Sequence, residues 1–301
     1  MMIYKDCILC EKGDYRLVYP ATQNDTQLDP YRCTCTNLGH GRFCQIVRCR
    51  HCGLTYSTPR YPDSEIINNY KKVVDEIYFS EKDYRKITFK KALKLIEKYK
   101  TSGAILDIGC YIGIFLEVAR EAGWKVFGLE PSQWAAKYAR EELKLQVLEG
   151  ITEEAFKFGV TFDVVTLWDT IEHMTDPLND LIRIRQLLND KGFLFISTMN
   201  MDSFFARVSG KRWPWLMDMH LYYFTPRTIS LLLEKAGFRV HKIRLFSYTV
   251  SLNYLSYKLL SVNKFLSQVV GKVLTILNIG QLPINIQLGD AMVVIAQKKN
   301  V

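Results

Sequence analysis

The sequence predicts an α/β protein in which a doubly wound, mostly parallel sheet of seven strands follows a small cysteine-rich domain. From residue 104 onward, short apolar runs alternate with segments of helical spacing, the pattern of a parallel sheet covered by helices on both faces. Two Cys-x2-Cys pairs stand within the first 52 residues. The net charge of +9 is uneven, at +6 over residues 1–100, −3 over 101–240 and +6 over 241–301, which indicates different partners for the middle and the ends.

The composition is that of a globular protein. Of the 301 residues, 48% are hydrophobic and 24% are charged, which excludes a disordered or collagen-like chain. The start reaches Lys5 before any signal-peptide core forms, and no apolar run has the length of a membrane span. We therefore expect a cytoplasmic protein whose eight cysteines do not form a disulfide framework.

The N-terminal cysteines predict a metal site. The two pairs consist of Cys7, Cys10, Cys49 and Cys52. Two such pairs supply four thiolates, the closed tetrahedral set of a structural zinc ion. The 38 residues between the pairs must loop out, and they contain Cys33, Cys35, Cys44 and His40. Those four are either side chains without a metal role, or a substitute ligand or second metal site.

The remaining chain supplies the strands and helices. A helical, lysine-rich connector is expected over 63–100. Expected strands are 104–108, 125–129, 145–148, 162–168, 193–197, 238–246 and 291–297. Expected helices are 113–120, 132–143, 176–188 and 225–237. The strand segments are nearly continuous apolar runs, as in strands buried on both faces. Asp176-Pro177 and Thr225-Pro226 are helix starts with a capping side chain and proline in the first turn.

The first strand-to-helix turn indicates a nucleoside ligand. Gly109 permits a tight turn after Asp107, and Gly113 permits a ligand to approach the helix N-terminus. Glu130 ends the next strand, where a carboxylate can accept hydrogen bonds from ribose hydroxyls. Tyr111 stands where a dinucleotide-binding loop has its middle glycine. The combination favours an adenosine ligand without a pyrophosphate.

At these residues the chain resembles the class I S-adenosylmethionine-dependent methyltransferases. The motifs are Ile105–Gly113, Val126–Pro131, Phe162–Pro177 and Gly192–Ser197. More narrowly, it resembles a subgroup with an N-terminal zinc ribbon, through Ile46–Tyr56 with Pro59, His220–Pro226 and Leu233–Phe238. Many members of that subgroup act in pathways for surface polysaccharides, modified sugars and other secondary metabolites. The chain departs from the family at Tyr111, where a glycine or small residue is usual.

The resemblance implies a domain plan and a cofactor site. It implies a zinc ribbon over 1–62, a connector over 63–100 and a Rossmann-like methyltransferase domain over 101–301, with insertions at 199–225 and 250–283. It implies cofactor-binding roles for Asp107, Gly109, Cys110 and Gly113 near the methionine portion, Glu130 at the ribose, Ile151 beside adenine and Trp168 near the methyl group. The implied cofactors are S-adenosylmethionine and a structural zinc ion.

Three residues are candidates for the chemistry. A hydroxyl acceptor must lose a proton during methyl transfer, and an imidazole or carboxylate can accept it. Asp169 and His173 lie on the turn after the fourth strand with Glu172, where they either bind a divalent metal or cap a helix and surround the cofactor. His220 is either a general base or a packed ring. Residues 213–215, Trp-Pro-Trp, are either a lid over the acceptor or hydrophobic cover.

The segment 251–279 has apolar residues at helical spacing, with Lys258, Lys264 and Lys272 as its only charges. It predicts a helix that covers the core or a dimer partner, or one that lies on a membrane surface.

The prediction for the whole chain is methyl transfer from S-adenosylmethionine to a hydroxyl, or a sugar carbon, of a small-molecule or glycan acceptor. The alternatives are an RNA methyltransferase with a basic zinc ribbon, and a non-catalytic scaffold of the same fold. Nucleic acid is the less favoured partner, because the middle of the chain is acidic. The sequence is compatible with a homodimer.

Overall fold

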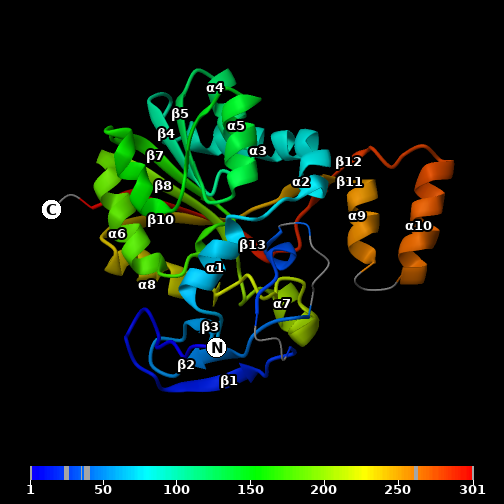
Figure 1. Cartoon of the computed structure of the whole chain (residues 1–301), viewed down its shortest axis with the longest axis horizontal. Helices are drawn as coiled ribbons and strands as arrows, with labels where there is room; N and C mark the ends of the chain where they lie inside the picture. Colours follow the sequence, from blue (N-terminus) through cyan, green and yellow to red (C-terminus); the bar gives the residue numbers. More distant parts are fainter. Residues whose placement is uncertain (1, 24–26, 35, 37–40, 261–263, 300–301) are drawn as a thin grey trace.

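A seven-stranded sheet forms the centre of the computed structural model, which describes residues 2–23, 27–34, 36, 41–260 and 264–299. The strands are β4 (Ala104–Ile108), β5 (Lys125–Glu130), β6 (Gln146–Glu149), β7 (Phe162–Trp168), β8 (Leu188–Met199), β10 (Phe238–Leu245) and β13 (Ala291–Lys298). Their order is β10-β13-β8-β7-β4-β5-β6 (Figure 1). Only β13 runs antiparallel to its two neighbours in this sheet, so the prediction of a mostly parallel seven-stranded sheet is confirmed. Cys35 and His40 lie outside the described residues.

Helices cover both faces of the sheet (Figure 1). The α-helices of the sheet domain and its connector are α1 (Asp63–Tyr70), α2 (Glu76–Ser80), α3 (Lys82–Ile96), α4 (Ile114–Glu121), α5 (Gln133–Glu141), α6 (Pro177–Leu187), α7 (Phe204–Ser209) and α8 (Pro226–Lys235). Short 3-10 turns are η1 (Pro30–Cys33), η2 (Thr152–Phe158), η3 (Ile171–His173) and η4 (Gly210–Arg212). The side chains of Asp176 and Thr225 accept hydrogen bonds from backbone N–H groups in the first turns of α6 and α8, as the sequence predicts.

Alternate residues of the central strands enter two different cores. On β7, Val164 lies with α3 and α4, whereas Val165 lies with α6 and α8. Phe195 and Ile196 of β8 divide in the same way. Because successive side chains of a strand point to opposite faces, strands buried on both sides need apolar residues at every position.

The N-terminal domain shares a sheet with the rest of the molecule. Its strands β1 (Tyr15–Tyr19), β2 (Ile46–Cys49) and β3 (Thr55–Ser57) are antiparallel, and β9 (Tyr222–Tyr223) completes the sheet beside β3. The sequence predicts a zinc ribbon over residues 1–62. In the structure the sheet of this segment has a fourth strand, β9, which comes from the insertion at 199–225.

The insertion near the C-terminus contains two helices where the spacing predicts one. These are α9 (Leu252–Leu259) and α10 (Lys264–Ile276), and residues 261–263 between them are not described. β11 (Tyr248–Ser251) and β12 (Pro283–Ile286) pair at their base. The Ser256 and Ser267 hydroxyls each donate to the other residue's carbonyl oxygen, at 3.2 and 2.8 Å. Two buried serines therefore join the helices, and most apolar side chains of α10 stay exposed.

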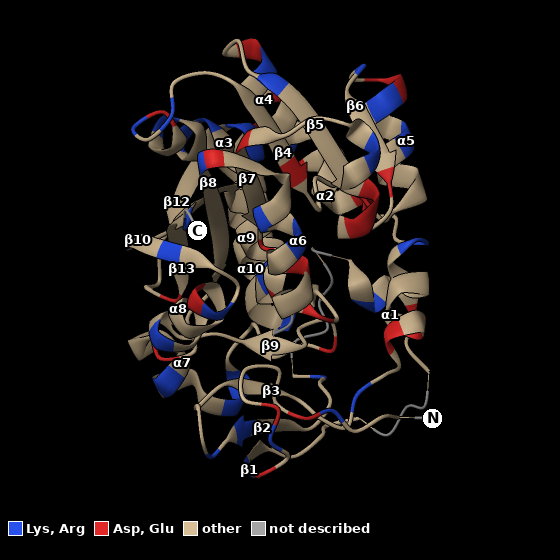
Figure 2. Ribbon diagram, turned by 90° about the vertical axis from the view of Figure 1, so that its left-hand side faces the viewer, with Lys and Arg blue, Asp and Glu red and all other residues tan. Residues whose placement is uncertain are grey.

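Charge separates this pair of helices from the sheet domain. Helices α5 and α6 each carry both basic and acidic residues (Figure 2). Helices α9 and α10 carry lysines and no acidic residue. Among the described residues, no helix combines the length and hydropathy that a bilayer crossing requires.

One carboxylate anchors the insertion at 199–225. The indole N–H groups of Trp213 and Trp215 both donate to the same oxygen of Asp290, at 2.9 Å each. Trp213 is 2% exposed and serves as hydrophobic cover. Trp215 stacks on the His220 ring instead, with centroids 6.2 Å apart.

Replacing Asp290 by Ala removes the acceptor of both indoles. We expect the free energy of unfolding to fall by roughly 2–4 kcal/mol, because the buried Trp213 donor left without a partner costs about 1–3 kcal/mol and the half-buried Trp215 loses its hydrogen bond as well. Asp290→Asn keeps an acceptor oxygen and should cost less. Urea unfolding of both variants measures the difference, and equal stability of Asp290→Ala and the parent would contradict the anchoring role.

Candidate active site

A cavity of about 1010 Å³ opens at the carboxyl ends of β4, β5, β7 and β8. This is the edge at which open parallel sheets bind ligands. The connector, the N-terminal domain and both insertions also contribute to its wall, among them Tyr78, Cys33, Trp215 and Tyr248. The volume matches that of pockets that enclose a cofactor and a small molecule.

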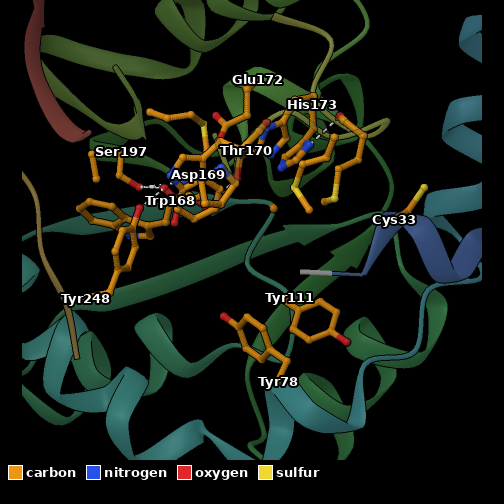
Figure 3. Close-up of a pocket in the computed structure, with 18 of the residues that line it drawn as sticks. Cys33, Tyr78, Tyr111, Trp168, Asp169, Thr170, Glu172, His173, Ser197 and Tyr248 are labelled. Atoms are coloured by element: carbon orange, nitrogen blue, oxygen red, sulfur yellow. Dashed lines mark hydrogen bonds between the residues drawn. The ribbon is translucent and has the colours of Figure 1, made fainter. Parts of the chain in front are cut away.

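The loop after β4 forms one end of the cavity. Gly109 has φ 75°, and a Cβ there would lie 2.7 Å from Thr170 Oγ1, so this turn requires glycine. Tyr111 also has a positive φ, of 48°. Its ring packs edge-on against Tyr78, with centroids 4.5 Å apart (Figure 3). Tyr111 therefore forms part of the wall, and Tyr78 fixes its position.

Two buried carboxyl groups lie next to this loop. Glu130 accepts hydrogen bonds from the backbone N–H groups of Tyr111 and Ser132, one on each oxygen at 2.7 Å. Burial raises the pKa of Glu130 to about 7, although both N–H groups oppose the shift. Asp107 accepts from Thr166 Oγ1 at 2.6 Å, and burial raises its pKa to about 8 against that hydrogen bond, with a further contribution from the charge of Glu130.

The structure brings part of the expected cofactor set to the cavity. Gly109, Glu130, Ile151 and Trp168 line it. The side chains of Asp107 and Cys110 are buried in the fold, and Gly113 is not in the wall. A Cβ at Gly113 would lie 2.6 Å from Leu145 Cδ1. This glycine permits close packing under α4, so the ligand-approach interpretation from sequence does not explain it.

Asp169 lies near the middle of the cavity. It has φ 49°, and its Oδ1 accepts hydrogen bonds from Ser197 Oγ and Tyr248 OH, both at 2.7 Å (Figure 3). Burial raises its pKa, and the two hydroxyls oppose this shift. The sequence offers no signal for Tyr248, which follows the expected last strand before the insertion.

His173 and His220, the other two candidate catalytic residues, lie beside Asp169 together with Glu172. His173 and His220 have ring centroids 4.8 Å apart, although 46 residues separate them along the chain. His173 Nδ1 donates to the Met219 carbonyl at 2.8 Å and His220 Nδ1 donates to the Trp215 carbonyl at 2.7 Å. In the neutral rings Nε2 is therefore the accepting nitrogen.

Burial shifts the pKa values of His173 and Glu172 in opposite directions. It lowers the pKa of His173 to about 4, against the hydrogen bond to Met219. It raises the pKa of Glu172 to about 8, with a further contribution from the negative charge of Asp169. The imidazole of His173 is consequently neutral at pH 7.

The four predicted metal cysteines form one cluster. Cys7 and Cys52 have sulfurs 3.3 Å apart, Cys10 and Cys49 have sulfurs 3.4 Å apart, and all four lie within 4.8 Å of one another. Tetrahedral zinc with bonds of about 2.3 Å needs sulfur separations of about 3.8 Å, so the donor set fits. In the described chain, Cys33 and Cys44 do not belong to this cluster.

These features define one cavity on an α/β sheet, with the buried carboxyl group of Glu130 at one end and the polar group of Asp169, Glu172, His173 and His220 at the other. The profile of the methyltransferase domain family matches residues 80–243, which is more than half of the chain. The chain belongs to this family, and its sheet is that of the class I S-adenosylmethionine-dependent methyltransferases.

Similar proteins include two bacterial enzymes named ubiquinone biosynthesis O-methyltransferase. The one from Photorhabdus laumondii is 30% identical over 157 residues, which are 48% of this chain and 65% of that protein. The one from Cereibacter sphaeroides is 33% identical over 145 residues, which are 44% of this chain and 59% of that protein. The chain thus spans less than two thirds of the length of these relatives.

Among solved structures, the chain is similar to a possible histamine N-methyltransferase from Thermotoga maritima. The TM-score is 0.49 and the identity 20%, with coverage of 74% of this chain and 94% of the other.

Proposed function

We propose that the protein transfers the methyl group of S-adenosylmethionine to a hydroxyl group of a small hydroxylated ring compound, of glycan or phenol type. The observation that carries the proposal is the continuity of one cavity from Glu130 to the polar group of Asp169, His173 and His220. The relatives' name, O-methyltransferase, supports an oxygen acceptor. Trp215 in the wall offers an aromatic face to a sugar or phenol ring.

In this proposal the cofactor binds at the end of the cavity near Glu130, and the acceptor binds at the end near Asp169. The cofactor supplies an electrophilic methyl group on a sulfonium when it is bound. Glu130 receives the ribose hydroxyls, because each of its oxygens keeps a second lone pair beyond the backbone hydrogen bonds. Gly109, Tyr111 and Ile151 line the cavity; the loop at Gly109 and Tyr111 would enclose the methionine end of the cofactor, and Ile151 would lie against adenine. Burial excludes water from the reacting atoms.

The acceptor end holds and deprotonates the hydroxyl. Asp169 is fixed by Ser197 and Tyr248, and it accepts a hydrogen bond from the acceptor. The same carboxylate takes the proton, and His173 and His220 line the cavity beside it. Alignment of oxygen, methyl carbon and sulfur accounts for most of the acceleration.

Removal of the Glu130 carboxylate should weaken cofactor binding. We expect calorimetry to show one equivalent of S-adenosylmethionine bound by the parent, and a roughly 5- to 150-fold weaker affinity for Glu130→Ala, from loss of about 1–3 kcal/mol. Glu149→Ala is a matched control, because Glu149 pairs with Glu130 in register but is exposed. Absence of binding by the parent would contradict the proposed function, and equal affinity of Glu130→Ala would contradict the ribose contact.

We also propose that the four-cysteine cluster binds one structural zinc ion. Cys49 ends β2, and Cys52 follows at the turn into β3, so the ion would fix the hairpin beside β9. The fit of four sulfurs to a tetrahedral ion supports this assignment.

Loss of the zinc ion should unfold the N-terminal domain. We expect one equivalent of zinc in the purified protein, and loss of zinc with a fall in Tm on the order of 10 °C in Cys49→Ser. Cys33→Ser should keep the metal, because this buried thiol lies outside the cluster. A zinc-free protein with the Tm of the parent would refute the structural role.

A third proposal concerns the hairpin of α9 and α10, which we infer contacts anionic membranes. It stands at the side of the molecule (Figure 1). Phe265 and Ile276 on α10 are 75% and 81% exposed. Lys264 and Lys272 accompany them without any acidic residue in either helix, which suits an apolar face that dips into an anionic lipid surface. Leu255 of α9 lines the cavity, so the hairpin adjoins the candidate active site.

Vesicles test this contact. We expect the protein to sediment at low salt with vesicles that contain anionic lipid. The double variant Phe265→Glu with Ile276→Glu should have at least tenfold lower affinity for these vesicles. Phe204→Glu is the control, since Phe204 is 84% exposed on α7, away from the hairpin. No sedimentation of the parent, or equal sedimentation of the double variant, would contradict the proposal.

A further inference from the structure

Three side chains at the acceptor end of the cavity form a second set of metal donors. Glu172 and His173 come from η3, and His220 comes from the segment before β9. Each offers one ligand atom, and these atoms all lie within 4.8 Å of one another. All three side chains line the cavity. We propose that Glu172, His173 and His220 bind a divalent transition-metal ion whose open coordination positions face the acceptor.

Both imidazoles are oriented as metal ligands are. A metal-binding histidine usually donates its second ring N–H to a carbonyl or carboxylate, which fixes the ring and leaves the other nitrogen to the ion. His173 donates to the Met219 carbonyl and His220 donates to the Trp215 carbonyl. Met219 and Trp215 belong to one short segment of the insertion, so the same backbone holds both rings.

The surroundings of Glu172 favour a bound cation. Its side chain is 0% exposed, and one oxygen accepts a hydrogen bond from Thr198 Oγ1 at 2.9 Å. In the described part of the chain, its other oxygen, Oε1, has no hydrogen-bond partner. A buried carboxylate oxygen in that state is costly, and a cation beside it removes the cost. The nearby carboxylate of Asp169 adds negative charge that also favours a cation.

The donor types select the class of ion. Two imidazoles and one carboxylate suit zinc, iron(II) or cobalt(II), whereas magnesium and calcium prefer oxygen ligands throughout. Three protein ligands leave positions open, as in catalytic rather than structural sites. Those positions suit an acceptor with two neighbouring oxygens, such as a diol or catechol. This acceptor role rests on the proposed function, whereas metal binding itself does not.

Cobalt(II) titration of the protein with its cysteine cluster loaded with zinc tests the site. We expect one equivalent of cobalt to bind, with weak d–d absorption and without the intense thiolate-to-cobalt band that exchange into the cysteine cluster would produce. Glu172→Gln and His220→Gln should each lower the cobalt affinity at least tenfold. His241→Gln should not, because His241 is exposed and bonds to Gln297 on another edge of the sheet.

The parent protein alone can refute the site: a titration that shows only the thiolate band, or no cobalt binding, overturns the proposal whether or not the variants fold. Parent-like affinity in Glu172→Gln and His220→Gln overturns it as well. Calorimetry with S-adenosylmethionine on the same samples reports the cofactor end separately. Cofactor binding without cobalt binding would therefore leave the proposed function standing while it removes the metal.

Discussion

The pairing of β9 with β3 is the contact on which the acceptor end of the cavity depends. Tyr222 and Tyr223 are in register with Tyr56 and Thr55. The residue before them, Leu221, donates its N–H to the Glu172 carbonyl at 2.8 Å and accepts from the Ser57 N–H at 2.9 Å. One short segment thus joins the N-terminal sheet to the turn after β7. His220 reaches His173 because of this double attachment, so a fault in the distant cysteine cluster would displace a cavity side chain.

Burial sets the electrostatics of the site at both ends. Asp107, Glu130 and Glu172 all have pKa values raised by burial, to about 8, 7 and 8. A carboxyl group in this state binds its proton more tightly in the folded chain than in the unfolded chain, so its contribution to stability falls as the pH rises through those values. The folded chain consequently carries a cost near neutral pH, and at Glu130 and Glu172, which line the cavity, a hydrogen-bond donor or a cation can offset it. Such a cost is expected where a protein prepares a binding site instead of a core.

Much of the sheet is predictable from sequence, because strands buried on both faces leave apolar runs and the helix starts carry capping residues. The cavity residues Gly109, Glu130 and Trp168 follow from the same order of elements. The pairing of β9 and the packing of Gly113 cannot be predicted from the local sequence, for physical reasons. A two-residue strand such as β9 has no period, and its pairing depends on contacts over more than 160 residues. The packing role of Gly113 depends on Leu145, which no local pattern reveals.

The two ends of the cavity are built from different kinds of structure. The end proposed to bind the cofactor consists of loops that follow β4, β5 and β6, whose positions the sheet fixes. Other parts of the wall come from Cys33 of the N-terminal domain, Trp215 of one insertion, and Tyr248 and Leu255 at the other. These segments lie outside the seven-stranded sheet, so substitutions in them can alter the acceptor region without a change in the sheet core. Asp169 connects the two arrangements, because it accepts hydrogen bonds from Ser197 of the sheet and from Tyr248 of the added segment. A shift of the added segments would therefore move Asp169, while Glu130 and its backbone donors would stay in place.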